Sequence, residues 1–105
     1  DPTYGKYIVI GGGGVLVELL SDSIPLLLPV TREDALVALS KLKVYPMLQG
    51  YRGKSSADID AVIDVVMSVV DLITSSEIIE LDINPLLVMT KGDGAIAVDA
   101  LVKLN

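Results

Sequence analysis

The sequence predicts an α+β fold: a mainly antiparallel sheet with two helices packed on one of its faces. Segments rich in β-formers occupy both ends of the 105-residue chain, and two segments with helical periodicity lie together between them. A glycine-rich turn signal near the C-terminus predicts a hairpin, and therefore antiparallel pairing. The length is that of one domain with a real core.

The N-terminal third is expected to be β-structure. Residues 6–10 (KYIVI) form a strand, four glycines at 11–14 interrupt it, and residues 15–20 (VLVELL) resume the pattern. A Ser-Asp-Ser turn then precedes IPLLLP. Because proline cannot donate to a sheet ladder, Pro25 and Pro29 place this last segment at a sheet edge or in an extended loop.

The first helix is predicted to begin after Thr31, in the segment TREDALVALSKLK. Threonine is a favoured N-cap residue, and Glu33 and Asp34 place negative charge in the first turn. Two lysines lie near the expected end. Tyr45-Pro46 is predicted to stop the helix.

The second and longest helix is predicted over residues 57–74, with Ser56 as its cap. Its apolar side chains follow the i, i+3, i+4, i+7 spacing, so one face of this helix must lie on a sheet. Residues 47–56, between the two helices, are expected to form a loop or a short turn of helix.

The C-terminal part is expected to be β-structure again: residues 77–83, residues 85–89, a hairpin turn at 90–94, and residues 95–104. Alternate side chains of a strand share a face. The run ELDINPLLV therefore projects Glu80, Asp82 and Asn84 to one side, and two apolar side chains to the other. Such a polar face is either solvated or a site.

Composition excludes several classes of function. The net charge is −6, the pI is near 4.3, and the eight basic residues form no stripe, which argues against nucleic acid as a partner. The chain has no cysteine and no histidine, so any imidazole chemistry must come from elsewhere. No apolar run reaches membrane-spanning length and no signal peptide is indicated, so a cytoplasmic protein without a membrane partner is expected.

Hydrophobic residues make up 51% of the chain, and its mean hydropathy is +0.62. These values are high for a chain without a membrane span. They indicate either a well-filled core or an apolar surface that a partner covers.

Three polar residues near the C-terminal hairpin could hold a metal ion. Counting outward from the turn places Asp99 opposite Asn84 or Leu86, depending on the register, with Asp82 next to them. Mg²⁺ prefers oxygen ligands and needs only one or two from protein when water and phosphate supply the rest. The alternative is that both aspartates are ordinary solvated residues of an exposed sheet face.

Two glycine-containing loops could contact a ligand. The GGGG segment allows backbone N–H groups to approach a ligand closely, although it is not a Walker A loop; the alternative is a flexible turn. In the segment GYRGK, Arg52 and Lys54 could meet an anion, or could simply be solvated.

Five collinear motifs carry a resemblance to a known family: DPTYG, GGGGVLVELLSD, LPVTREDA, YPMLQGYRGKSSADIDAVID, and IIELDINPLLV with GAIAVDA. Together they resemble the C-terminal part of the ATP-grasp domain of NDP-forming acyl-CoA synthetases. This group includes ADP-forming acetyl-CoA synthetase and relatives of the succinyl-CoA synthetase β subunit. The fold that it implies is the C-terminal subdomain of ATP-grasp.

The resemblance implies a role for each candidate residue. Asn84 and Asp99 match the Mg²⁺ ligands of the family. Asp82 matches an acidic residue that contacts the phosphohistidine when it reaches the nucleotide site. Gly13 and Gly14 match a loop that borders the bound nucleotide. The implied cofactors are Mg²⁺ and ATP or ADP.

The family reaction converts acyl-CoA, ADP and phosphate to acid, CoA and ATP through a phosphohistidine. Residues 1–105 would then be a single domain of a larger ATP-grasp protein. The implied partners are a CoA-binding and phosphohistidine domain or subunit and the remaining ATP-grasp subdomain. The isolated chain is expected to be inactive.

Two alternatives remain open. One is a non-catalytic ATP-grasp-like segment of a protein acetyltransferase, with a regulatory or structural role. It is favoured by Ser21 and Leu26, which stand where the family pattern has a Lys and an Arg. The other is an unrelated acidic α+β interaction module.

Overall fold

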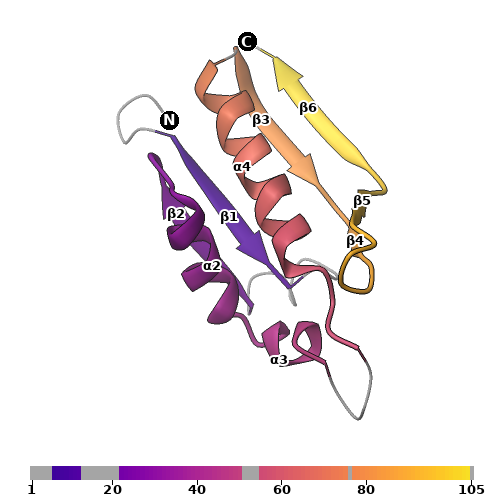
Figure 1. The fold of residues 1–105 in the computed structure, drawn as a ribbon. Helices are drawn as coiled ribbons and strands as arrows, with labels where there is room; N and C mark the ends of the chain where they lie inside the picture. The colour runs from indigo at the N-terminus through magenta and orange to yellow at the C-terminus, as the bar shows by residue number, and fades with distance from the viewer. Residues whose placement is uncertain (1–5, 13–21, 51–54, 76, 105) are drawn as a thin grey trace.

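The structure is a computed structural model that describes residues 6–12, 22–50, 55–75 and 77–104 (Figure 1). Strands come first and last, and helices lie between them, as predicted. In chain order the elements are β1 (Tyr7–Gly11), β2 (Ser23–Leu27), α2 (Arg32–Ser40), α3 (Tyr45–Leu48), α4 (Ile59–Ser75), β3 (Ile78–Ile83), β4 (Leu86–Val88), β5 (Ala95–Ala97) and β6 (Ala100–Leu104).

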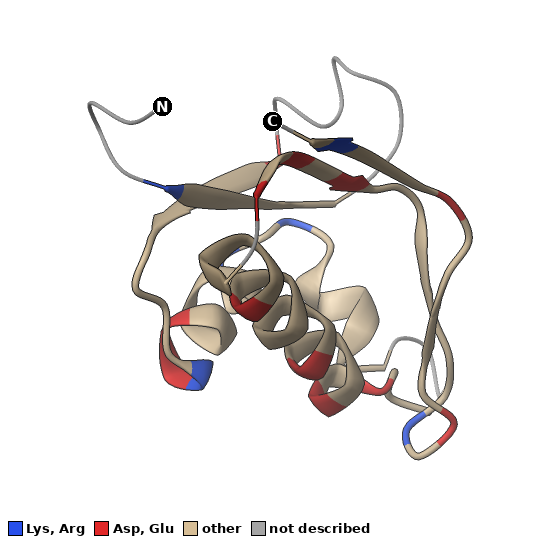
Figure 2. Cartoon of the chain, turned by 90° about the horizontal axis from the view of Figure 1, so that it is seen from above, with Lys and Arg blue, Asp and Glu red and all other residues tan. Residues whose placement is uncertain are grey.

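The strands lie in one curved layer, and α2 and α4 pack side by side on one face of it (Figures 1 and 2). Helix α2 contacts β2, while α4 contacts α2, β3, β4 and β5. Every strand pair in the described residues is antiparallel. The predicted α+β class is therefore confirmed, with the short α3 as an additional element.

The first two described strands form an antiparallel pair, with Ile8 opposite Leu26. Ile8 is buried and Leu26 packs against the core, so alternate side chains of this pair face the helices. Pro25 lies within β2, which pairs with β1 alone among the described strands, as the edge prediction requires. The strand predicted at residues 15–20 lies outside the described residues.

Helix α2 begins as predicted. The Thr31 Oγ1 accepts a hydrogen bond from the Asp34 N–H at 3.1 Å, and the Asp34 carboxylate accepts one from the Thr31 N–H at 3.0 Å. This capping box satisfies two backbone donors at once. The predicted stop is wrong, however: α2 ends at Ser40, and Tyr45 and Pro46 open α3 instead. Proline is tolerated in a first helical turn because its missing N–H would have no helical partner there.

Helix α4 begins two residues later than predicted. It is Asp58, and not Ser56, that caps it, because the Asp58 Oδ1 accepts a hydrogen bond from the Ala61 N–H at 3.1 Å. Ala57 forms an antiparallel bridge with Thr90. Because Ala57 lies in this bridge, it is not the first residue of the helix, and Ser56 is therefore not at the cap position.

The core lies between the helices and the strands. Its buried members come from β1, the segment before α2, α2 itself, the segment after α2, and α4: Ile8, Val30, Ala35, Leu39, Leu42, Val62, Ile63 and Val70. The predicted apolar face of α4 is confirmed, since its remaining periodic positions also pack against this cluster. Burial of this face fixes α4 on the strands.

The C-terminal hairpin contains a bend. Strand β3 pairs with β6 and β4 pairs with β5, and the two ladders are separated at residues 84–85 and 98–99. Backbone pairing continues across the bend, because the Val98 N–H donates to the Pro85 carbonyl at 3.1 Å. Pro85 therefore interrupts the strand without ending the hairpin. Among the residues described, no helix combines the length and apolar character that a bilayer crossing requires.

Candidate functional site

The alternation predicted for ELDINPLLV is present in β3. Leu81 and Ile83 are half-buried on the side of the helices, whereas Glu80, Asp82 and Asn84 are exposed. Glu80 and Asp82 therefore share the face of β3 that points away from α4, and Asn84 lies exposed just beyond the end of the strand. Packing of the apolar alternate positions leaves the carboxylates and the amide accessible to a ligand.

The structure also decides the register of the hairpin. Ile83 pairs with Ala100 and Leu86 pairs with Ala97, which places Asn84 opposite Asp99. A hydrogen bond of 3.1 Å from the Asn84 N–H to the Asp99 carbonyl confirms this pairing. The register with Leu86 opposite Asp99 is thereby excluded.

The donor set at the bend suits a hard cation. The Asn84 side chain offers an amide oxygen and Asp99 offers a carboxylate, both on exposed residues. The Asp99 Oδ1 accepts a hydrogen bond from the Ala100 N–H at 2.9 Å, which orients the carboxylate. The described residues contain no group of three or more acidic ligands that could hold a metal alone. Mg²⁺ can be bound by two protein oxygens when water and phosphate complete its coordination shell.

Asp82 lies close to these two residues, on the face of β3 that points away from the helices. It lies in β3, two positions before Asn84 in the sequence, and it pairs with Leu101 of β6. Its exposed carboxylate can therefore reach a group that approaches the bend from outside the sheet.

The other predicted contacts come from the two glycine-containing loops. Gly13, Gly14, Arg52 and Lys54 lie outside the described residues. The preceding Gly12 is described, and its N–H donates to the Asp22 carbonyl at 2.8 Å.

The surroundings of Gly12 leave no room for a side chain. A Cβ at this position would lie 2.3 Å from the Asp22 Oδ2 and 3.0 Å from the Val44 Cγ1. Asp22 is held in place, because its Oδ1 accepts a hydrogen bond from the Lys43 N–H at 2.6 Å. The entry to the glycine segment is therefore packed closely against the connection between α2 and α3.

The sequence reasoning did not single out Asp58. Its carboxylate accepts hydrogen bonds from three backbone N–H groups, those of Ala61, Gly92 and Gly94. The hydrogen bonds from Gly94 and then Ala61, with smaller contributions from Gly92 and the Lys91 charge, lower the pKa of this carboxyl. An aspartate three positions before Ala61, at the start of the apolar periodicity, is the signal that could have identified this cap.

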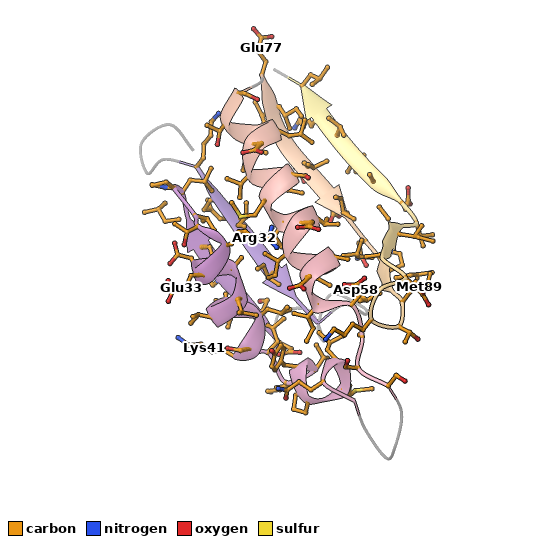
Figure 3. All side chains as sticks on the ribbon, in the orientation of Figure 1. Arg32, Glu33, Lys41, Asp58, Glu77 and Met89 are labelled. Atoms are coloured by element: carbon orange, nitrogen blue, oxygen red, sulfur yellow. The ribbon has the colours of Figure 1, made fainter. Side chains whose placement is uncertain are left out.

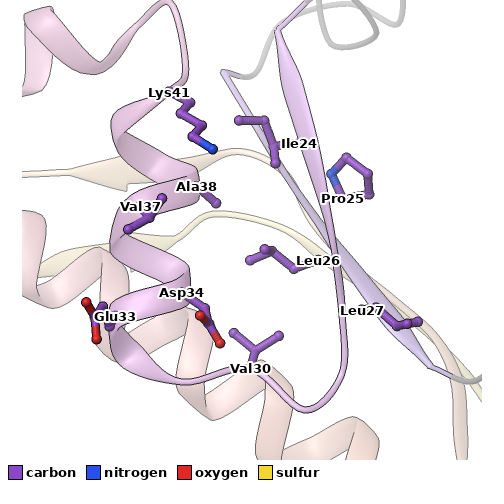
Figure 4. Close-up of a pocket in the computed structure, with 10 residues that line it drawn as sticks. All are labelled: Ile24, Pro25, Leu26, Leu27, Val30, Glu33, Asp34, Val37, Ala38 and Lys41. Atoms are coloured by element: carbon purple, nitrogen blue, oxygen red, sulfur yellow. The ribbon is translucent and has the colours of Figure 1, made fainter.

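A shallow groove of about 430 Å³ lies between β2 and α2, away from the hairpin bend (Figures 1 and 4). Ile24, Leu26 and Val37 form part of its apolar lining, with Glu33 and Lys41 among its charged residues. The groove contains none of the predicted site residues.

Comparisons with known proteins agree with this architecture. The beta subunit of an ADP-forming acetate–CoA ligase II from Pyrococcus furiosus is 41% identical over 107 residues, covering 100% of this chain and 45% of that protein. A crystal structure of a Pyrococcus horikoshii protein superposes with a TM-score of 0.88 at 39% identity, covering 100% of this chain and 45% of that one.

A third relative was solved with ligands. It is the dinucleotide-forming acetyl-coenzyme A synthetase 1 of Ca. Korarchaeum cryptofilum, in complex with coenzyme A and Mg-AMPPCP, with its phosphohistidine segment pointing towards the nucleotide-binding site. It matches with a TM-score of 0.86 at 34% identity, covering 100% of this chain and 49% of that one.

The chain thus spans about half the length of each of these three relatives. The family model described as the ATP-grasp domain matches residues 1–104, nearly the whole chain. The chain belongs to the ATP-grasp domain family, and its relatives include ADP-forming acetate–CoA ligases.

Proposed function

We propose that this chain forms the Mg²⁺- and nucleotide-binding half of the active site of an ADP-forming acyl-CoA synthetase. The observation that carries the proposal is the pairing of Asn84 with Asp99 on the exposed face of the hairpin bend. Membership of the ATP-grasp family and similarity to ADP-forming acetate–CoA ligases support it.

In this proposal the Asn84 amide oxygen and the Asp99 carboxylate hold Mg²⁺. Mg²⁺ held by these two residues would supply neutralisation of the charge on the phosphate oxygens. Asp82 orients the phosphohistidine that enters from outside the sheet. Gly13 and Gly14, which match the family loop beside the nucleotide, would border the bound nucleotide. The chain's own task is then to position these groups, as phosphoryl transfer requires.

The proposed overall reaction is acyl-CoA, ADP and phosphate to acid, CoA and ATP. Because the chain has no histidine, the phosphohistidine must come from a CoA-binding domain or partner subunit. The phosphohistidine segment in the Ca. Korarchaeum cryptofilum complex supports this role for a separate element. We place the reaction in the cytoplasm, where acyl-CoA and nucleotides are available, and residues 1–105 form one domain of the complete protein.

An exposed apolar face supports the need for such partners. On the side of the strands away from the helices, Tyr7 is 57% exposed and the opposing Leu27 is 64% exposed. Leu101, opposite Asp82, is 61% exposed. Apolar side chains gathered on one face favour coverage by another part of the protein. We propose that the remaining ATP-grasp subdomain covers it.

The second candidate is a non-catalytic ATP-grasp-like segment of a protein acetyltransferase. The position of Leu26 favours it, since this side chain packs against the core and offers no cation to a phosphate group. The paired Asn84 and Asp99 favour the synthetase, because a segment that binds no nucleotide has no need of them.

The test uses the complete protein that contains this chain. ATP formation from acetyl-CoA, ADP and phosphate is measured at varied Mg²⁺ for the wild type, Asn84→Ala, Asp99→Ala and the control Asp93→Asn. Asp93 lies exposed in the hairpin turn. The proposal requires activity in the wild type and the control, and loss of Mg²⁺-dependent turnover in the two site variants with unchanged circular dichroism. Wild-type turnover in Asp99→Ala would overturn the metal assignment.

A wild-type protein without ATP formation would favour the acetyltransferase segment instead. A panel of acyl-CoA substrates guards against an acyl preference other than acetyl. Equilibrium dialysis with Mg-ADP then decides between the candidates, since the non-catalytic segment is expected to bind no nucleotide.

A further inference from the structure

One aspartate joins the start of α4 to the turn of the C-terminal hairpin. The Asp58 N–H donates to the Met89 carbonyl at 2.8 Å, and the two residues lie close together in Figure 3. The Asp58 Oδ2 accepts hydrogen bonds from the Gly92 N–H at 3.1 Å and from the Gly94 N–H at 2.9 Å. We call the contacts between residues 55–58 and 89–94 the Asp58 junction.

The two carboxylate oxygens of Asp58 have separate roles. Oδ1 accepts the Ala61 N–H and caps the helix, whereas Oδ2 accepts two N–H groups from the turn. Gly92 and Gly94 have φ values of +93° and +88°, a conformation that glycine adopts without strain and that directs both N–H groups to one oxygen. Hydrogen bonds to a charged acceptor are stronger than those between neutral groups.

Backbone contacts complete the Asp58 junction. The Lys91 N–H donates to the Ser56 carbonyl at 2.9 Å, and Ala57 forms its bridge with Thr90. The turn is therefore attached to the segment before α4 along its whole length. The carboxylate is the only side chain that contributes a hydrogen bond to this junction within the described residues.

The same hairpin carries the candidate metal ligands at its other end. Strands β4 and β5 contain three residues each, and beyond them lie the Pro85–Val98 and Asn84–Asp99 pairs. Leu86 and Val88 pack against the core and hold one face of the hairpin. A short two-stranded ladder is marginally stable alone. Its position on α4 therefore depends on this apolar contact and on the Asp58 junction.

We infer that Asp58 is a positioning residue: by holding the turn on α4, its carboxylate sets how Asn84 and Asp99 are presented to a metal ion. The consequence for Mg²⁺ rests on the proposed function, whereas the consequence for the hairpin does not. Loss of the side-chain hydrogen bonds leaves the turn held only by its backbone contacts with residues 56–58 and by the apolar face of the hairpin. The Asn84–Asp99 pair then opens more often, and Mg²⁺ binds less tightly because its ligands are preorganised for a smaller fraction of the time.

Two substitutions separate the two roles of the carboxylate. Asn and Ser are both good N-caps, so Asp58→Asn and Asp58→Ser retain an acceptor for the Ala61 N–H. Each has one side-chain oxygen in place of two, so an oxygen that caps the helix leaves the turn glycines without the acceptor that Oδ2 provides. Asp93→Asn is the matched control, because it removes the same charge from the turn without removing a side-chain hydrogen bond of the described structure.

The first measurement is hydrogen–deuterium exchange of the complete protein. Loss of the charged hydrogen bonds is expected to speed exchange in the peptide covering residues 84–99 by about tenfold. The peptide covering α4 should exchange at the wild-type rate in both Asp58 variants, and Asp93→Asn should match the wild type throughout. Unchanged exchange of residues 84–99 in Asp58→Asn and Asp58→Ser would overturn the inference.

The second measurement is ATP formation at varied Mg²⁺. The apparent KM for Mg²⁺ is expected to rise about tenfold in both Asp58 variants, while the KM for acyl-CoA stays unchanged. A merely structural role would lower the active fraction and leave both KM values unchanged, which would contradict the inference. If Asn84→Ala and Asp99→Ala also leave the Mg²⁺ dependence unchanged, the proposed metal site fails, while the exchange experiment still tests the junction.

Discussion

Asn84 and Asp99 face each other across the bend of the C-terminal hairpin, joined by a hydrogen bond of 3.1 Å from the Asn84 N–H to the Asp99 carbonyl. Both residues are exposed, so an amide oxygen and a carboxylate are accessible to solvent at this bend. The residues are 15 positions apart in the chain, and the turn at Gly92 and Gly94 brings them together. The pairing of these two residues is the basis of the proposed site.

Removing the charge of Asp99 tests the site with little change in shape. In Asp99→Asn the side-chain oxygen can still accept from the Ala100 N–H, so the local turn is retained. We expect Mg²⁺-dependent ATP formation by the complete protein to fall by about a hundredfold, because a neutral amide is a poorer Mg²⁺ ligand than a carboxylate. The melting temperature should stay within about 2 °C of the wild type, since Asp99 is exposed. An equal loss of ATP formation in Asp93→Asn would show that removal of any negative charge from this hairpin has the same effect, and would contradict the role of Asp99 as a ligand.

Gly12→Ala is expected to destabilise the fold. The new Cβ would lie 2.3 Å from the Asp22 Oδ2, and the hydrogen bond to the Lys43 N–H limits how far that carboxylate can move. Overpacking of this kind costs about 1–3 kcal/mol in the free energy of unfolding, measurable by urea denaturation. In an Asp22→Ala background the same substitution should cost less. An equal cost in both backgrounds would assign the clash to Val44 instead.

Acid should remove the contribution of Asp58 to stability. Its pKa is lowered in the folded state, chiefly by the Gly94 N–H, from the ordinary value of 3.8 that applies in the unfolded chain. The unfolded state therefore binds the proton more tightly, and the stabilisation is fully present above pH 3.8 and is lost as the pH falls through the lowered pKa.

Urea denaturation from pH 6 to pH 2 checks this expectation. The difference in unfolding free energy between the wild type and Asp58→Asn should be constant near neutral pH and should shrink only in acid. Groups common to both proteins cancel in this difference. If the difference in unfolding free energy stayed constant down to pH 2, the lowered pKa of Asp58 would be contradicted.

Core packing and surface charge should differ sharply in their effects on α4. Ile63 is 3% exposed and belongs to the central cluster, so Ile63→Ala should lower the unfolding free energy by about 2–5 kcal/mol. The neighbouring Asp64 forms an ion pair of 2.7 Å with Arg32, and both side chains are largely exposed. Asp64→Ala should cost at most about 1 kcal/mol. Thermal denaturation of the two variants checks the contrast, and similar costs would contradict it.

Local features of the fold were predictable from sequence. The capping box of Thr31 and Asp34 involves residues three apart, and the alternation around Asp82 needs only the period of a strand. The turn glycines likewise identify the hairpin from a few neighbouring residues. Each of these features depends on side-chain chemistry and spacing within one short segment.

Features that join distant segments were decided by the tertiary structure. The cap of α4 moved from Ser56 to Asp58 because Ala57 pairs with Thr90, far along the chain. The pairing of Asp99 with Asn84 rather than Leu86 likewise could not be read from the alternation of side chains, because the two registers differ by two residues and leave each side chain on the same face. The ladder that pairs Val88 with Ala95 and Leu86 with Ala97 decides between them.

The sequence by itself therefore determined the order of elements, the polar face of β3 and the three residues of the candidate site. The tertiary structure alone decided which residues oppose each other across the hairpin and that Asp58 fixes its turn to α4. The physical reason is the distance along the chain over which each kind of interaction acts. Capping and alternation are set within a few residues, whereas register and docking depend on the apolar contacts that the folded chain can bury at once.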